Sequence, residues 1–178
     1  IKSVLIPVFN KDGLDELCKI FFQHKIKIFS TGGTEKYIKN LNIPVKSVES
    51  VTGYPSILGG RVKTLHPKIF GSILSRNNNK EDQIDILKHE VPKIDMVIVD
   101  LYPFSETVKS SDDENEIIEK IDIGGVSLIR AGAKNFSDII IVSQKKQYGS
   151  VIKYLKKNNF SSEITFRKKL AFEAFNLI

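Results

Sequence analysis

Short apolar runs alternate with amphipathic stretches along most of the chain. The apolar runs predict β-strands at residues 3–8, 26–30, 43–48, 95–102 and 138–142. The run at 95–102 is almost entirely apolar at its centre, which is typical of a strand buried in a parallel sheet. The alternation of strands with helix-like segments indicates an α/β protein.

The segments between these runs carry apolar residues at helical spacing, as Leu14, Leu17 and Phe21 do. Helices are expected at 12–24, from the TGGT segment to about Leu41, and at 81–90, 125–135, 145–157 and 162–177. Ser111 and Glu114 have the spacing of a capping box, so a short acidic helix is predicted to end near Ile121. Residues 52–79 show no period and are expected to be irregular.

This order of elements predicts a three-layer α/β/α fold with a mainly parallel, doubly wound, Rossmann-like sheet in one domain over residues 1–178. Ligands bind such sheets in the crevice beyond the carboxyl ends of the strands. The loops to search are therefore 9–11, 30–34, 52–74 and 100–105.

Composition narrows the class of partner. The formal net charge is +6 and the sequence pI is about 9.3, which favours an anionic partner. The lysines are spread along the chain without a basic run interleaved with aromatic residues, so a phosphorylated metabolite is favoured over nucleic acid. Cys18 is the only cysteine, which excludes a disulfide framework and fits the cytoplasm. No apolar run reaches the ~18 residues of a membrane span.

The STGGT segment at 30–34 follows a predicted strand and opens a predicted helix. Glycines let backbone amides approach an anion, and the helix N-terminus adds partial positive charge, so the segment is interpreted as a phosphate site. The alternative is a tight turn whose Ser or Thr caps the helix.

The segment GGRVKTLHPKIFG at 59–71 brings Arg61, Lys63, Thr64 and His66 together in a stretch without regular period. Arg61 could hold a phosphate or carboxylate, and Lys63 could stabilise a developing oxyanion. The alternative is a solvated loop. Metal binding through His66 is not predicted, because His24 and His89 fall on predicted helices and no ligand spacing joins the three.

Two further segments carry candidate chemistry. Tyr102 in DLYPF follows the most apolar strand and faces the expected crevice, although it could equally cap the core. Asp122 in IDIGG precedes a predicted helix, where it could be an N-cap or could face a substrate. Lys134 lies near the end of that helix; it could serve the helix dipole or form an acid–base pair with Asp122 if the fold joins them.

Taken together and in this order, STGGT, GRVKTLHPKIFG, LYPF, IDIGG and RAGAKN resemble the N-terminal cyclohydrolase domain of the bifunctional formyltransferase/inosine monophosphate (IMP) cyclohydrolases of purine biosynthesis. The resemblance covers nearly the whole chain. It implies a methylglyoxal-synthase-like fold, a homodimer, and a ring closure without cofactor or metal. A formyltransferase domain using 10-formyltetrahydrofolate as co-substrate would follow residue 178.

The resemblance also implies roles for individual residues. Lys63, Tyr102, Asp122 and Lys134 would be the catalytic group. Substrate would be held by Lys11, Ser30, Thr31, Gly32, Gly33, Arg61, Thr64, Asp100, Leu101, Ile123 and Gly124. In the implied reaction, the carboxamide nitrogen of formamidoimidazole-carboxamide ribotide (FAICAR) attacks its own formyl carbon, and water leaves.

The chain departs from the family pattern at several positions. Where the family has Ser-x-Ser-Asp-Lys, this chain has Pro7 to Lys11, with Phe9 in place of the second Ser and Asn10 in place of Asp. Asp100 replaces an Asn, Phe70 replaces a His, and GGVSLIR replaces GGPxxxR. Because the proposed catalytic four survive, activity is expected, with altered affinity.

Two rival functions share this fold. A methylglyoxal synthase needs an acidic residue after paired glycines, where this chain has Arg61 after Gly60. A phosphate- or nucleotide-binding regulatory module could share STGGT but has no need for the four catalytic residues together. Binding of IMP without ring closure would identify such a module.

Overall fold

A five-stranded sheet forms the centre of the computed structural model, which describes residues 1–178. Its strands are β1 (Ser3–Leu5), β2 (Lys27–Ser30), β3 (Val45–Ser47), β4 (Met96–Ile98) and β5 (Ile140–Val142), in the order β3-β2-β1-β4-β5. Every pairing is parallel. The predicted doubly wound α/β fold is confirmed.

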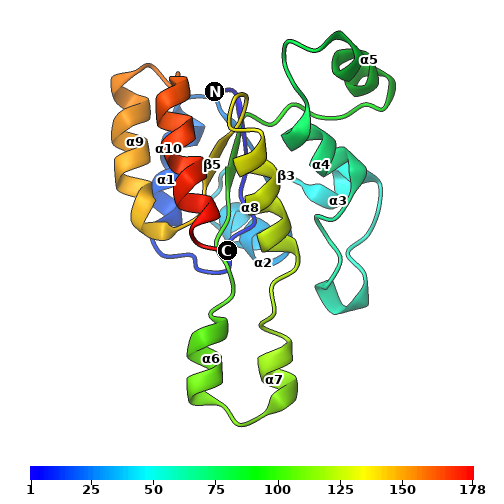
Figure 1. Ribbon diagram of the computed structural model, residues 1–178, viewed down its shortest axis with the longest axis vertical. Helices are drawn as coiled ribbons and strands as arrows, with labels where there is room; N and C mark the ends of the chain where they lie inside the picture. Colours follow the sequence, from blue (N-terminus) through cyan, green and yellow to red (C-terminus); the bar gives the residue numbers. More distant parts are fainter.

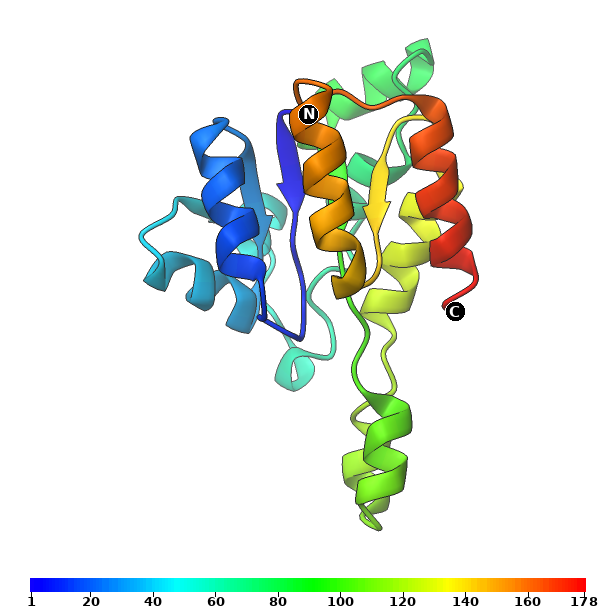
Figure 2. The ribbon, with the colours of Figure 1, turned by 90° about the vertical axis from the view of Figure 1, so that its left-hand side faces the viewer.

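Helices cover both faces of this sheet (Figure 1). They are α1 (Leu14–Gln23), α2 (Gly32–Asn40), α3 (Val48–Thr52), α4 (Pro67–Leu74), α5 (Lys80–Lys88), α6 (Phe104–Ser110), α7 (Glu114–Ile118), α8 (Gly124–Lys134), α9 (Tyr148–Lys157) and α10 (Ile164–Phe175), with 3₁₀ turns η1 (Leu58–Gly60) and η2 (Lys145–Gln147). Figure 2 shows α1 and α9 on one face, with α10 beside β5 at the edge. On the other face, α8 packs against β5 and α4.

Burial of the strands' apolar side chains holds these layers together. Leu5, Ile98 and Ile141, at the centres and ends of three strands, are fully buried. The helix α1 adds the apolar face that its spacing predicts, including Leu17 and Phe21. Continuous apolar strands and one-sided helices are the pattern of a sheet covered on both faces.

The expectation that residues 52–79 are irregular is wrong for α4. His66 is the N-cap of this helix, and its Nδ1 accepts a hydrogen bond from the Lys68 amide at 3.1 Å. Pro67 occupies the first turn, where a missing N–H costs nothing. Ile69 and Ile73 are fully buried at helical spacing. The cap and this spacing explain the helix, and they give His66 a structural position.

A helical hairpin of α6 and α7 projects from the end of the molecule that holds the carboxyl ends of the strands (Figures 1 and 2). The sequence did not predict α6, and it placed the start of the second helix too early. The N-cap of α7 is Asp113, whose carboxylate accepts from the Asn115 amide at 2.9 Å. Ser111 instead donates its hydroxyl to Glu116.

Candidate active site

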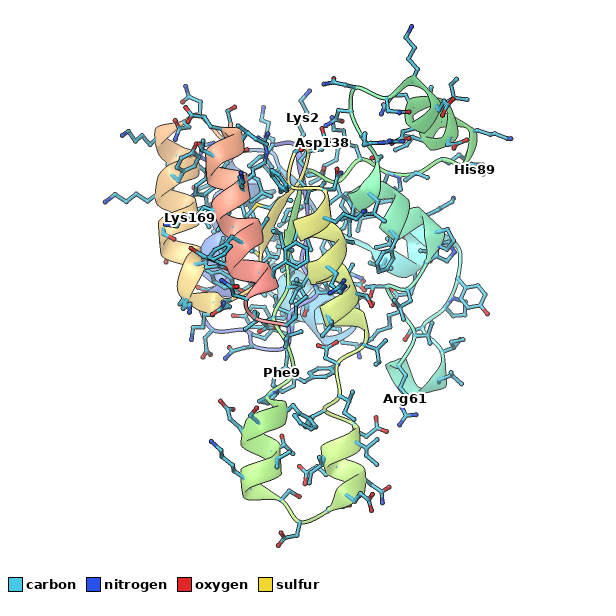
Figure 3. All side chains as sticks on the ribbon, in the orientation of Figure 1. Lys2, Phe9, Arg61, His89, Asp138 and Lys169 are labelled. Atoms are coloured by element: carbon cyan, nitrogen blue, oxygen red, sulfur yellow. The ribbon has the colours of Figure 1, made fainter.

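A cavity of about 550 Å³ opens at the carboxyl ends of the strands, at the base of the α6–α7 hairpin. Loops that follow β1, β2 and β4 contribute to its wall, as the topology predicts. Figure 3 shows Phe9 at this end of the molecule, facing the hairpin, and Arg61 on the neighbouring loop. Segments distant in sequence therefore meet here.

Most of the residues expected at a site line this cavity. They are Lys11, Thr31, Gly33, Arg61, Lys63, Thr64, Asp100, Tyr102, Asp122, Ile123 and Gly124. Ser30, Gly32, Leu101 and Lys134 are not among the lining residues. The fold thus brings three of the four expected catalytic residues into one cavity.

The start of α2 is the part of the cavity best suited to a phosphate. No side chain caps this helix, so its first backbone amides point outward without an intrahelical partner. Gly32 adopts the left-handed φ of +55°, and Lys63 Nζ lies 3.7 Å from the place where a Cβ of Gly32 would be. Backbone donors, a helix N-terminus and a lysine meet at this point.

The hydroxyl groups of STGGT have other partners. Ser30 is fully buried and donates to the Ile6 carbonyl at 2.6 Å. Thr31 donates to the Glu49 carboxylate at 2.7 Å, and Thr34 donates to the Val8 carbonyl at 2.6 Å. The direct role of Ser30 as a phosphate ligand does not fit this placement. The amides of the segment are better placed than its hydroxyls to meet an anion.

Asp122 is held at the start of α8 by two backbone donors. Its carboxylate accepts from the Gly125 amide at 2.6 Å and from the Tyr102 amide at 3.4 Å. Burial raises the pKa of Asp122 above its ordinary value, against the opposite effects of these amides and of Lys63. The Asp122 carboxylate thus satisfies an amide in the first turn of α8 while it lines the cavity.

Tyr102 lies beside Asp122 with its phenol partly buried. Burial, assisted by the charges of Asp122 and Asp100, raises the pKa of Tyr102 above its ordinary value of 10.0. The phenol is therefore neutral at physiological pH, and it can donate a hydrogen bond to a developing oxyanion.

Lys11 turns back onto the loop that carries it. Its Nζ donates to the carbonyls of Val8 at 2.5 Å and Phe9 at 2.7 Å. Burial lowers the pKa of Lys11, and the charge of Lys63 acts in the same direction while that of Asp100 opposes it. To reach a phosphate, this lysine must give up bonds to its own loop.

Arg61 and Thr64 both line the cavity, but they differ in exposure and in the groups they contact. The exposed Arg61 guanidinium pairs with Glu119, a partner 58 residues away in sequence. Thr64 is buried, and its Oγ1 lies 3.4 Å from where a Cβ of Gly124 would be. A Cβ at Gly124 would therefore meet Thr64 at ordinary van der Waals distance.

Lys134 lies away from the cavity. It is exposed at the last position of α8, whereas Gly124 at the first position lines the cavity. Ten residues of α-helix separate them, which is about 15 Å. The expected pair of Asp122 and Lys134 is therefore not formed within one chain.

Sequence reasoning missed several members of the site. Phe9, Thr34 and Glu119 line the cavity, and Glu49 lies behind Thr31. Thr34 had a local signal because it belongs to STGGT. Glu49 and Glu119 had none, since each is recognised only through a partner distant in sequence.

The cavity is lined by equal numbers of positively and negatively charged side chains. Lys11, Arg61 and Lys63 are cationic, and Asp100, Glu119 and Asp122 are anionic. Arg61 and Glu119 neutralise each other by direct pairing. Two lysines near the start of α2 and two carboxylates near β4 remain, so the cavity suits a ligand with an anionic end and a polar, neutral end.

Comparison with known proteins places this fold and site in a family. The MGS-like domain family matches residues 13–127, and the chain belongs to it. The AICARFT/IMPCHase bienzyme family matches residues 132–178. The chain is similar to the bifunctional purine biosynthesis protein PurH of Bacteroides thetaiotaomicron, with 52% identity over 175 residues, covering 98% of this chain and 34% of that protein.

Two further similarities agree. PurH of Clostridium acetobutylicum is 46% identical over 180 residues, covering 100% of this chain and 36% of that protein. The crystal structure of ForH superposes with a TM-score of 0.86 at 27% identity, covering 99% of this chain and 91% of that one. The chain spans about a third of the length of the PurH relatives.

Proposed function

We propose that the chain is an IMP cyclohydrolase, which closes the purine ring of FAICAR to give IMP and water. The observation that carries this proposal is the meeting of Lys63, Tyr102 and Asp122 in one cavity whose other end is an anion site. The similarity to PurH proteins supports the substrate class. We assign no formyl transfer to residues 1–178.

The cavity can perform this closure by positioning and proton handling. The phosphate binds at the start of α2, and the base extends past Lys63 toward Asp122 and Tyr102. The Asp122 carboxylate draws on a carboxamide N–H as the nitrogen attacks the formyl carbon. Tyr102 and Lys63 donate to the formyl oxygen as it gains charge. One proton from the carboxamide nitrogen and one from the formamido nitrogen end on this oxygen, the C–O bond breaks, and water leaves as the ring C=N bond forms.

Holding the two reacting groups of one substrate together accounts for much of the expected acceleration. The closure forms one C–N bond within the substrate, breaks one C–O bond and otherwise moves only protons, so we propose that it uses no cofactor. The reaction has no redox step and moves no group between molecules.

We further propose that the protein acts in the cytoplasm as a homodimer, and that Lys134 serves the cavity of a second copy. The family resemblance assigns Lys134 to the catalytic group, while α8 holds it about 15 Å from the start of its own cavity. Lys134 can therefore be catalytic only if it reaches the cavity of a neighbouring chain. Helix α8 presents this lysine to solvent, where a second copy could receive it.

The central experiment follows purine absorbance after FAICAR is added to the purified chain. We expect Lys63→Ala and Tyr102→Phe to lower the closure rate by about 10² or more, because each removes a donor to the developing oxyanion. Lys153→Ala, which removes an exposed lysine on α9, is the matched control and leaves the rate unchanged. A chain that binds IMP but never forms it would be a binding module, and the proposal would fail.

A further inference from the structure

Two carboxylates flank β4 and bind the backbone of the β1 segment, Asp95 through one oxygen and Asp100 through both. Asp95, just before β4, accepts from the amides of Lys2 at 2.6 Å and Ser3 at 3.1 Å. Asp100, just after β4, accepts from the amide of Phe9 and from that of Asn10 at 2.9 Å. Each carboxylate thus joins two consecutive amides, one pair at the start of β1 and the other in the loop that follows it.

The Asp100 contact lies at the cavity end of the sheet and closes the loop after β1. Consecutive amides in such a loop are ordinarily donors for a bound anion. Here the two Asp100 oxygens occupy those donors, while Lys11 Nζ occupies the carbonyls of Val8 and Phe9. The loop is therefore fixed by side chains of the protein itself.

This fixed backbone sets the position of the Phe9 ring. Phe9 meets Tyr102 edge to face, with ring centroids 5.2 Å apart and planes at 88°. Lys120 Nζ lies 5.8 Å from the centre of the Phe9 ring. Both are favourable geometries for an aromatic ring. A path of contacts thus runs from the Asp100 carboxylate through Phe9 to the Tyr102 phenol.

We propose that Asp100 is a positioning residue: its carboxylate fixes the Phe9–Asn10 backbone so that the Phe9 ring holds Tyr102 in the cavity. This replaces the expectation that Asp100 contacts the substrate. Its catalytic consequence rests on the proposed function, whereas the backbone contact does not. Phe9 and Asp100, both departures from the family pattern, then act as one unit.

The backbone contact is tested without substrate, by amide hydrogen exchange measured by NMR. Asp100→Asn keeps the size of the side chain but turns an NH₂ toward one of the two amides. We expect exchange at Phe9 or Asn10 to become about tenfold faster or more, because a charge-assisted bond is lost. Asp95→Asn is the matched control: its two backbone bonds go to one oxygen, which the amide keeps, and exchange at Phe9 and Asn10 stays unchanged. Unchanged exchange at both Phe9 and Asn10 in the Asp100 variant would overturn the proposal.

The catalytic consequence is tested by kinetics on the same variants. We expect Asp100→Asn and Phe9→Leu each to lower kcat by about fivefold to tenfold with KM changed less than about threefold, since both act through Tyr102. The double variant is expected to be no slower than the slower single variant. Asp95→Asn leaves kcat unchanged.

Two outcomes would contradict this role. A raised KM with unchanged kcat in Asp100→Asn would mean a substrate contact. Effects that multiply in the double variant would mean that Asp100 and Phe9 act separately. If the unaltered chain closes no ring at all, the proposed function fails, while hydrogen exchange still decides the backbone contact.

Discussion

Asp122 combines two requirements that oppose each other. In the proposed closure its carboxylate must be ionised to draw on the substrate N–H, yet burial raises its pKa and so disfavours the ionised form. The amides of Gly125 and Tyr102 offset part of this effect. Titratable groups with pKa values shifted by burial and neighbouring charges are common in catalytic sites.

The first prediction concerns Asp122→Asn. The pKa of Asp122 is higher in the folded protein than in the unfolded chain, so ionisation costs the folded state stability as pH rises through these values. At neutral pH the Asn variant should therefore melt at the same or a higher temperature than the unaltered chain. The closure rate should fall by about 10² to 10⁴, because the proton acceptor is lost.

Thermal melts and closure rates over a pH series measure both effects. The difference in melting temperature should shrink as the pH falls toward 4, and the acid limb of kcat/KM should lie above the ordinary Asp pKa of 3.8. Asp112→Asn, at an exposed position on the hairpin, is the control for loss of one negative charge. A variant that is clearly less stable at neutral pH would contradict the sign of this argument.

Helix α8 meets the sheet at Gly132, where element packing outweighs helix propensity. A Cβ at Gly132 would lie 2.9 Å from Cδ1 of Ile141 and 3.2 Å from its Cβ. Alanine favours the helix by about 1 kcal/mol over glycine. Overpacking of a well-filled core costs about 1–3 kcal/mol. The balance favours glycine while Ile141 faces it.

The second prediction follows from this balance. Gly132→Ala should destabilise the protein by about 1 kcal/mol, and Ile141→Val alone by about 0.5–1.5 kcal/mol. The double variant should be more stable than the sum of the single effects, because the smaller side chain makes room for the new methyl group. Denaturant unfolding measures this. Gly149→Ala on α9, where a Cβ meets nothing within 4 Å, is the control and should stabilise. Additive effects would mean that the two side chains do not compete for space.

The strands and the helices packed on the sheet were predictable, because the spacing of their apolar residues matches the faces that the fold buries. The strands appeared where apolar runs occur, although the sheet uses only part of each run, as Met96–Ile98 within 95–102 shows. Helix α4 was missed because its cap is a His and its length is two turns. Helix α6 was missed because it projects from the core and carries no sustained apolar face.

The site was predictable only where a local motif carries it. STGGT and IDIGG indicated the correct loops, since glycines near a helix start leave a local signal. The partners of Arg61, Thr31 and Asp100 could not be predicted, because each contact joins segments that only the sheet order brings together. Lys134 shows the converse: a motif identifies the residue, but the fold places it far from the cavity.

At the scale of the whole molecule, the position of Lys134 bears on how many chains make one site. In Figure 1, α8 runs alongside the strands, so its two ends lie near opposite ends of the sheet. Gly124, Gly125 and Leu128 of its first half line the cavity, and Lys134, its last residue, is exposed and does not. No side-chain rotation of a lysine covers about 15 Å of helix. A catalytic Lys134 therefore requires a second copy of the chain.

The third prediction is that two inactive variants restore activity when they are combined. Lys63→Ala and Lys134→Ala should each lower closure by about 10² or more. In a mixed dimer, one cavity has lost both lysines, while the other combines an intact Lys63 with an intact Lys134 of the other chain. Random exchange of equal amounts makes half of the dimers mixed, so about a quarter of the unaltered activity should return. Closure rates after co-refolding of the two variants measure this.

The control is a mixture of Lys63→Ala with Tyr102→Phe, two residues that line the same cavity of one chain. No mixed dimer of these variants contains an intact cavity, so activity should stay low. If Lys63→Ala and Lys134→Ala stay inactive together while light scattering shows exchanged dimers, Lys134 does not act across chains. If Lys134→Ala alone closes the ring at the normal rate, its assignment to the catalytic group is wrong, and Lys63, Tyr102 and Asp122 form the complete group within one chain.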